Sequence, residues 1–328
     1  MATSALTAPS SVEYGLTQPT QEAVSGTYAL TRRIAWAASS IGLGVLIAGF
    51  WNYKLVDGFG REVVTANTIG NSHQLATSFA SNGVGFGLVF AAIAGLAATF
   101  TACNCVVFAM LPGLACSTDR AASRRSALRL LLRFAIGVVL VGAIYGVYVG
   151  TLGAAGASKF NAIPSRLLQA EVVFTVLGVV LVIWGAIEFG FLNFIVRRIP
   201  DGLKQFIATP ATRASIMGVM VGLFAVGRPY PIFRDLLVYA ASSHNPLYGA
   251  AVMSIQGIGQ IALMVVLFLI LVWAFGSRLT QWVASRPAQP ALVTAIALVA
   301  GGSYFIFYWG IALTTHIGQW GFKLGWYS

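Results

Sequence analysis

Charged residues are scarce in this sequence, and their scarcity excludes most soluble folds. Only 9% of the 328 residues are charged, whereas 58% are hydrophobic, and the mean hydropathy is +0.81. An ordinary soluble domain carries about 25% charged residues, so a chain this apolar could not hide its hydrophobic surface from water. The sequence therefore predicts a polytopic membrane protein surrounded by the lipid bilayer. The formal net charge of +11 does not indicate a nucleic-acid partner, because the basic residues fall between apolar segments.

Cysteine and histidine are also rare. The three cysteines cannot form the disulfide framework of an extracellular protein, and the three histidines are too scattered to predict a metal site. The sequence contains no phosphate-binding loop, zinc signature or catalytic-triad pattern, and we expect no cofactor. Residues 1–32 lack the apolar core of a signal peptide, so we expect them to form a polar cytoplasmic tail.

Seven hydrophobic segments have the length and composition of membrane spans. They are expected at about 33–51, 83–114, 133–154, 170–195, 214–240, 248–276 and 290–314. The predicted fold class is therefore an all-α polytopic membrane protein of about seven transmembrane helices. Residues 33–82 would form an extra N-terminal helix with an outer loop, and residues 83–328 would form the transmembrane core.

Basic residues are concentrated in every second connection between these segments. The connections between the second and third, fourth and fifth, and sixth and seventh segments are rich in arginine and lysine, and Arg32 and Arg33 precede the first segment. By the positive-inside rule, these connections lie in the cytoplasm. The opposite side would then receive only Lys54, Arg61, Lys159, Arg166 and Lys323. We therefore expect a multi-pass protein of the cell membrane, with its N-terminus in the cytoplasm and its C-terminus outside.

The last six segments group into two triplets, 83–195 and 214–314, and each triplet contains an unusual first helix. The first carries GLAATFTACNCVVFAMLPG (95–113), and the second carries GLFAVGRPYPIFRDLLVYAASS (222–243). Both stretches begin with Gly-Leu and place polar residues or prolines about eight positions later, and the two helices would run in opposite directions. Such a pair of interrupted helices is typical of inverted repeats with a site near the membrane midplane.

Both first helices are predicted to break near the middle of the bilayer, at about 101–105 and 227–231, and to pack against each other. In the second helix, Pro229 and Pro231 flank Tyr230. Proline removes a backbone donor and clashes with the preceding turn, so this helix is expected to kink or break.

The polar patch of the first helix contains two cysteines. On a regular helix, Cys103 and Cys105 would point in nearly opposite directions, so their thiols could meet only where the helix unwinds. Asn104 and Pro112 favour local unwinding, which is tolerated where the backbone lines a cavity. The thiols could form a redox pair, bind a soft metal together with Met110, or serve as small buried apolar groups.

The second helix places charged side chains at or near membrane depth. Such residues normally face a bundle interior or a cavity and are paired. Arg228, Arg234 and Asp235 are the candidates, with Glu188 taken as the only other deep acid and their partner; the alternative is a purely structural ion pair or a position at the interface. We expect the polar patch of the first helix to share an interior cavity with Arg228 and Tyr230, because unpaired polar groups are costly at this depth. A nearby arginine would favour the thiolate form of a cysteine.

The stretch NCVVFAMLP (104–112) resembles the CcdA/DsbD transmembrane family of thiol-redox proteins, within the broader LysE-like group. Each of the two inverted three-helix repeats of that family begins with a helix in the style of Thr-Pro-Cys-Val-x-Pro-Met-x-Pro. Here Cys105 takes the cysteine position, and Met110 and Pro112 resemble the Met-x-Pro end. The resemblance covers about residues 83–314.

Two positions depart from the family pattern. Asn104 stands where the family has proline, and Tyr230 occupies the place of the cysteine in the second repeat. The resemblance implies a disulfide pair with one cysteine from each repeat, which a cytoplasmic thioredoxin reduces and which then reduces an outer partner. In this chain the pair would have to be Cys103 and Cys105, or one of these with Cys116.

The leading hypothesis is a thiol–disulfide oxidoreductase of the membrane, with Cys103 and Cys105 as its catalytic residues. Its partners would be a cytoplasmic thioredoxin and an extracytoplasmic thiol protein, such as one that serves cytochrome c biogenesis. The first alternative is a transporter of a soft metal or small solute, with Cys103, Cys105 and Met110 as ligands. The second alternative is a non-redox accessory subunit of a larger membrane complex.

Overall fold

The computed structural model describes residues 24–99 and 123–326, apart from 197, 199, 201, 204, 205, 207, 208 and 287. The regular structure in these ranges is helical, with no strand among the described residues. Six helices in this part of the chain are long and apolar enough to cross a membrane: Phe79–Thr99, Leu128–Phe160, Ile163–Glu188, Pro210–Gly227, Pro246–Ile270 and Ala288–Thr315. With the additional N-terminal helix α2, they confirm the all-α polytopic membrane fold.

The elements before the first undescribed internal stretch are mostly short. They are α2 (Leu30–Gly49), α3 (Tyr53–Gly58), the π-helix η1 (Phe59–Thr65), α4 (Ala66–Thr68), α5 (Ser72–Ala76) and α6 (Phe79–Thr99). The elements after it begin with α8 (Ser123–Phe160), α9 (Ile163–Glu188), α10 (Asn193–Val196), α12 (Pro210–Gly227) and α13 (Pro231–Ala241). The chain then continues through α14 (Pro246–Ser285), α15 (Ala288–Phe305), the π-helix η2 (Ile306–Ala312), α16 (Leu313–Thr315) and α17 (Trp320–Lys323).

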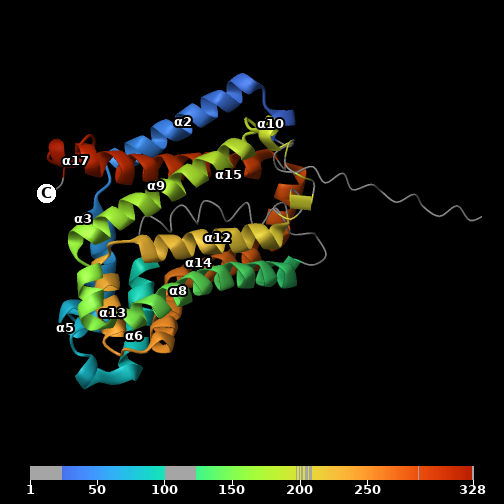
Figure 1. Ribbon diagram of the computed structural model, residues 1–328. Coiled ribbons are helices and arrows are strands. Elements are labelled where there is room, and N and C mark those ends of the chain that lie inside the picture. Colours follow the sequence, from blue (N-terminus) through green and yellow to red (C-terminus); the bar gives the residue numbers. More distant parts are fainter. Residues whose placement is uncertain are drawn as a thin grey trace, which may run out of the picture.

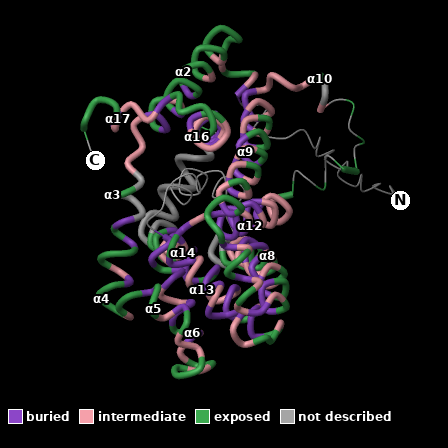
Figure 2. Tube along the Cα trace, turned by 60° about the vertical axis from the view of Figure 1, so that its left-hand side comes forward, coloured by how far each residue is buried: buried purple, intermediate pink, exposed green. Residues whose placement is uncertain are grey.

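The helices pack in two connected groups. In one group α15 packs on α9 and α2, and in the other α14 and α12 pack on α8 while α6 packs on α14. Figure 1 shows α13 turning sharply from the direction of α12 and lying with α5 and α6 at one end of the molecule. Most residues of α2 are exposed, whereas buried residues gather around α12, α13 and α14 (Figure 2).

Helices that hold the same place in the two predicted repeats pack against each other in opposite directions. The middle helices, α8 and α14, are in contact, and so are the third helices, α9 and α15. Along α8, Gly146 meets Gly249 and the later Gly150 meets the earlier Asn245, so α8 and α14 are antiparallel. Equivalent helices that run in opposite directions are what an inverted repeat requires.

Glycines mark the points where these helices cross most closely. The crossing pairs are Gly95 with Gly259, Gly137 with Gly218, and Gly178 with Gly302. A Cβ atom on the first member of each pair would lie 2.8–2.9 Å from a backbone atom of the second, and small residues permit such an approach between membrane helices. Each of these glycines in the first triplet has an equivalent in the second, at nearly the same distance along the sequence. The pairs are Gly95 and Gly218, Gly137 and Gly259, and Gly178 and Gly302, and their separations differ by at most two positions. These nearly equal intervals are what the predicted inverted repeat would produce.

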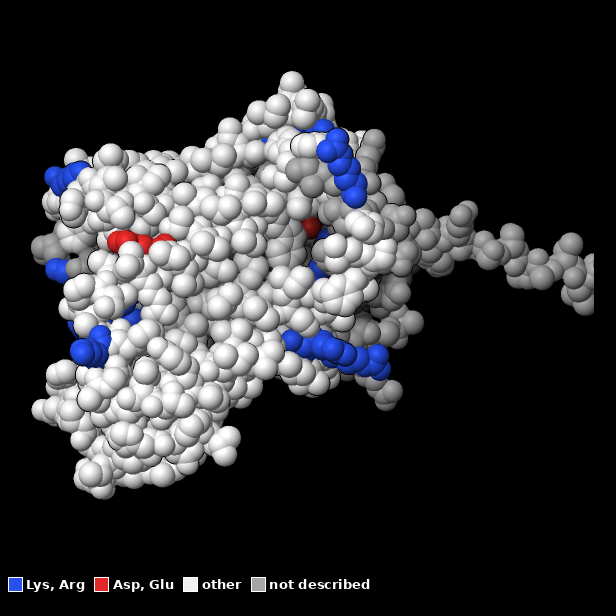
Figure 3. Space-filling model, viewed as in Figure 1, with Lys and Arg blue, Asp and Glu red and all other residues white. Residues whose placement is uncertain are grey.

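Charged side chains gather at the two ends of the molecule. Figure 3 shows lysines and arginines at both ends of the visible face, and few charges on the surface between them. Along α8, the side chains of Ile136, Leu140 and Ile144 are more than half exposed. Because they lie one helical turn apart on one face, they provide an apolar surface suited to lipid.

The first helix of the second triplet breaks where the sequence predicts. Helix α12 ends at Gly227, and α13 begins at Pro231. The break predicted at 101–105 lies outside the described residues, and with it the predicted contact between the two breaks.

Candidate functional site

Residues 228–230 form the non-helical link between α12 and α13. Arg228 and Tyr230 both have extended backbone angles, with ψ of 135° and 127°. Pro231 occupies the first turn of α13, where proline is tolerated because its missing N–H has no helical partner. The break leaves the last carbonyl groups of α12 without the donors that a continuing helix would supply.

Arg166, in the first turn of α9, supplies donors to that helix end. Its Nη2 donates to the backbone oxygens of Val226 at 2.7 Å and Arg228 at 2.9 Å. Its Nη1 donates to the hydroxyl of Tyr145 at 2.8 Å and to Oε1 of Gln169 at 2.6 Å. A positive group at a helix C-terminus also interacts favourably with the helix dipole. Arg166 therefore holds the break in α12 by both hydrogen bonding and charge.

The sequence groups Arg166 with the basic residues of the outer side, and the structure adds that its side chain is buried between helices. The side chain is 0% exposed, and its guanidinium lies 5.5–6.0 Å from the ring centroids of Tyr145, Phe160 and Phe233. The sequence did not predict the burial of Arg166, because α9 begins before the hydrophobic run and Arg166 was counted in the connection between two spans. Pro164, two positions before Arg166, was the available signal, since proline favours the first turn of a helix.

A cavity of about 680 Å³ lies against the break. Arg228, Pro229, Tyr230 and Pro231 line one side of it. A second side is aromatic and comes from α15 and η2, with Tyr304, Phe305, Tyr308 and Trp309. The third side comes from α3, η1 and the link between α2 and α3, with Trp51, Lys54, Gly58, Arg61 and Glu62. Arg228 and Tyr230 therefore line a cavity, whereas the polar patch at 101–105 that was predicted to share it lies outside the described residues.

Basic residues outnumber acidic ones among the described residues that line the cavity. Arg228 is 9% exposed, and its guanidinium carbon lies 4.9 Å from the ring centroid of Tyr230. Glu62, the one acid among the described residues that line the cavity, is bound by Arg61 at 2.9 Å. Lys54 and Arg228 are the other basic residues in the lining.

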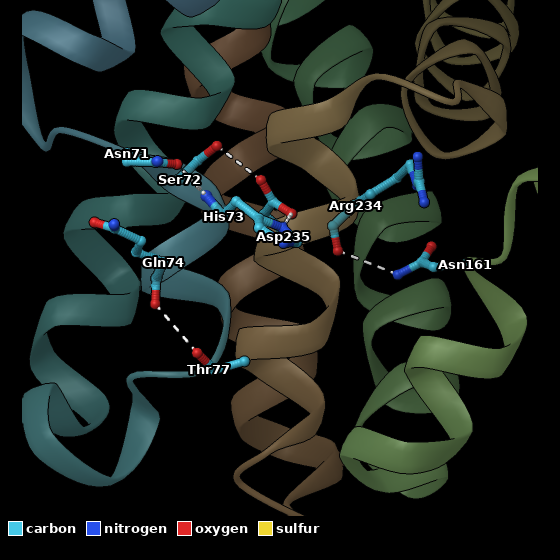
Figure 4. Close-up of polar contacts among 8 residues, drawn as sticks. All are labelled: Asn71, Ser72, His73, Gln74, Thr77, Asn161, Arg234 and Asp235. Carbon is cyan, nitrogen blue, oxygen red and sulfur yellow. Dashed lines mark hydrogen bonds and ion pairs between the residues drawn. The ribbon is translucent and has the colours of Figure 1, made fainter.

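Asp235 and Arg234 lie on α13 but do not line this cavity. Asp235 faces α5, where its Oδ2 accepts a hydrogen bond from Ser72 Oγ at 2.7 Å and its Oδ1 lies 3.5 Å from Nδ1 of His73. Figure 4 shows the Arg234 side chain pointing away from this contact, while its backbone oxygen accepts from Asn161 at 3.1 Å. Asp235 therefore fastens α5 to α13.

The sequence suggested Glu188 as the partner of the charged residues at 228–235, but the structure pairs it with another residue. Its Oε1 lies 3.4 Å from Nη2 of Arg213 and accepts a hydrogen bond from Nε1 of Trp184 at 3.2 Å. The assumption that no other deep acid exists is also wrong, because Glu171 lies half-buried within the same span. Glu188 therefore joins α9 to α12 and does not line the cavity.

The candidate residues of the first predicted helix lie outside the described residues. They are Cys103, Asn104, Cys105, Met110, Pro112 and Cys116. Just before them, the hydroxyl of Thr99 donates to the backbone oxygen of Gln260 at 3.0 Å, and Nε2 of Gln256 donates to Oε1 of Gln260 at 3.2 Å. Both glutamines are buried. Within the described ranges, no group of three or more His, Cys, Asp or Glu residues could hold a metal ion.

The family comparison covers most of the predicted repeat pair. A model of the family described as cytochrome C biogenesis protein transmembrane domain matches residues 85–286. The matched region runs from α6 to α14 and includes Arg166 and the break at Arg228, whereas α2, α3, η1 and α15 lie outside it. No curated protein and no solved structure matches the chain. Because the family model covers more than half of the sequence, the chain belongs to the family of cytochrome C biogenesis protein transmembrane domains.

Proposed function

We propose that this protein passes reducing equivalents across the membrane by thiol–disulfide exchange, with Cys103 and Cys105 as the exchanging pair. The observation that carries the proposal is the family match, which extends over both first helices of the two repeats. The break between α12 and α13 adds support, because it brings the guanidinium of Arg228 to the wall of an interior cavity. A cation favours the thiolate, which is the reactive form of cysteine.

The exchange would run in two balanced steps. A thiolate of a reduced cytoplasmic thioredoxin attacks the Cys103–Cys105 disulfide and forms a mixed disulfide, and the second thiol of the thioredoxin displaces the chain. The thioredoxin leaves oxidised, and the chain retains two electrons and two protons as a dithiol. The dithiol then reduces a disulfide of an extracytoplasmic thiol protein by the same chemistry.

The test is alkylation of the protein in native membranes with a maleimide that shifts its mobility on a gel. Oxidised protein should take up one maleimide, at Cys116, and protein reduced by thioredoxin should take up three. The Cys103→Ser and Cys105→Ser variants should each lose this redox dependence, because the remaining cysteine has no partner. Cys116→Ser is the matched control and should keep the difference of two labels.

Two results would contradict the proposal. One is full labelling of Cys103 and Cys105 under oxidising conditions. The other is a protein that purifies with a membrane complex whose activity is the same in both serine variants, which would indicate the accessory-subunit alternative instead.

A further inference from the structure

Three of the four residues that follow α16 have positive φ angles. His316 has φ of 55° and ψ of 17°, Gln319 has φ of 54° and ψ of 38°, and Gly318 has φ of 108°. The chain then forms the single turn of α17, which lies at the same end of the molecule as α3 (Figure 1). We propose that residues 316–326 form a hinged lid that controls entry to the cavity at the break. This inference goes beyond the proposed function and does not depend on the cysteines.

The segment borders the cavity directly. Leu313 and Gln319, which lie before and within the turn, both line the cavity. Gly318 is buried, and a Cβ atom added to it would lie 3.1 Å from Cε1 of Phe307 and 3.3 Å from Cβ of Ala312. Phe307 and Ala312 belong to η2, which also supplies part of the aromatic wall of the cavity. The segment therefore folds back over η2 and places a polar side chain at the cavity.

Two residues of the turn have a strained backbone. In the left-handed region the Cβ atom lies too close to the following carbonyl oxygen, so residues other than glycine adopt this conformation at a cost. His316 and Gln319 both adopt it, and such conformations persist only where the surrounding structure holds them. If those contacts were released, both residues could relax. The turn therefore favours opening of the lid.

Two tryptophans hold the segment against the end of α2. Trp320 packs edge-on against Phe50 with ring centroids 5.6 Å apart, and Trp326 stacks on the same ring with centroids 4.9 Å apart. The ring of Trp320 also covers Gly49, where an added Cβ atom would overlap it. Edge-on and stacked pairs of this kind are favourable beyond the area that they bury. These aromatic contacts, which lie outside the matched family region, therefore act as the latch of the lid.

The segment has little structure of its own that would keep it closed. Helix α17 is four residues long, and a helix this short is not stable without tertiary contacts. Leu324 and Trp326 are 60% and 69% exposed, and lids are drawn from parts of a protein with few buried apolar contacts. The aromatic latch and the strained turn act against each other, so a change in either should shift the balance between the closed and open forms.

The test measures how fast N-ethylmaleimide labels a single cysteine inside the cavity. Leu167→Cys places this reporter on the part of the lining that α9 supplies, in the purified full-length chain in detergent with its native cysteines replaced by serine. Gly49→Ala should raise the labelling rate at least about tenfold, because the added methyl group overlaps Trp320 and overpacking is destabilising. The matched control is Gly42→Ala on the same helix, where an added Cβ atom has no neighbour within 4 Å and the rate should not change.

A second pair of variants tests the hinge in the same reporter chain. His316→Gly relieves the left-handed strain and should slow labelling about threefold, because this relief exceeds the conformational entropy that glycine adds to the open form. His316→Ala keeps the strain and should be labelled at least as fast as the parent chain. Both changes are at an exposed residue outside the cavity lining.

Three outcomes would overturn the inference. One is a parent chain that is labelled at Leu167→Cys as fast as a chain with Leu324→Cys, a change at an exposed residue. The others are equal rates in Gly49→Ala and Gly42→Ala, and equal rates in His316→Gly and His316→Ala. If Gly49→Ala does not give a monodisperse protein, the two His316 variants decide the question alone. Because the native cysteines are absent, the result is independent of thiol exchange.

Discussion

Arg166 shows how one side chain can make a helix break tolerable inside a membrane protein. A proline-interrupted helix leaves carbonyl groups that lipid cannot solvate, and each must be satisfied within the protein. The guanidinium of Arg166 reaches the oxygens of both Val226 and Arg228 through Nη2 and uses Nη1 for Tyr145 and Gln169. Its planar set of donors suits this arrangement, which the ammonium group of lysine cannot reproduce.

We expect Arg166→Met to destabilise the protein strongly. Two buried carbonyl groups would lose their donors, and leaving one buried polar group unsatisfied costs about 1–3 kcal/mol. Thermal unfolding of the detergent-solubilised protein, followed by circular dichroism, should show a clearly lower Tm for Arg166→Met and an intermediate value for Arg166→Lys. The control is Arg61→Met, whose ion pair with Glu62 is exposed and contributes little. An unchanged Tm in Arg166→Met would show that the break does not depend on this side chain.

The parts of the site that could be predicted are those encoded by neighbouring residues. Pro229, Tyr230 and Pro231 predict a break because proline acts on its own helix. Arg166 and Tyr308 reach the site only because α9 packs against α12 and η2 packs against α9. Such tertiary contacts leave no local pattern in the sequence.

At the scale of helices, glycines determine how closely α8 and α14 approach each other. A Cβ atom on Gly146 would overlap the carbonyl oxygen of Gly249, and the reverse substitution meets the carbonyl oxygen of Gly146. The obstacle in each case is backbone, so a whole helix would have to shift. Close contacts of this kind contribute the packing that holds helices together where no hydrophobic force acts between them.

We therefore expect Gly146→Ala to lower the stability by about 1–3 kcal/mol, the usual cost of overpacking. The matched control is Gly85→Ala on α6, where an added Cβ atom has no neighbour within 4 Å. Alanine also favours helix more than glycine does, so the control should be neutral or slightly stabilising. Denaturation in mixed micelles of both variants measures the difference. Equal stability of the two variants would refute the tight crossing of α8 and α14.

The elements themselves were predictable to different degrees. Long apolar runs revealed the spans, because a bilayer requires about 20 apolar residues from each helix. The stretch expected as an outer loop at 52–82 instead contains α3, η1, α4 and α5. These short helices are polar and lack a clear hydrophobic period, and α5 is held by its contact with Asp235. The π-helical turns of η1 and η2 also have no sequence signal of their own.

At the scale of the whole molecule, the distribution of basic residues predicts an N-terminus in the cytoplasm and a C-terminus outside. The physical reason is that arginine and lysine near the ends of spans are retained on the cytoplasmic side. The measurement uses single cysteines introduced by Thr7→Cys and Ser328→Cys into a chain whose native cysteines are replaced by serine. A maleimide that cannot cross membranes should label intact cells carrying Ser328→Cys and spare those carrying Thr7→Cys. Labelling of both positions, or of neither, in intact cells would contradict the seven-span topology.

The cation buried at the break also bears on the permeability of the membrane. A helix interrupted in the bilayer is a weak point through which protons and metal ions could leak and dissipate the gradients that the cell maintains. Fixed arginine charges raise the electrostatic barrier to such cations, as they do in selective pores. Arg166 is held at the interruption by its hydrogen bond to the backbone oxygen of Arg228, so we expect the break to oppose the passage of positive ions across the membrane.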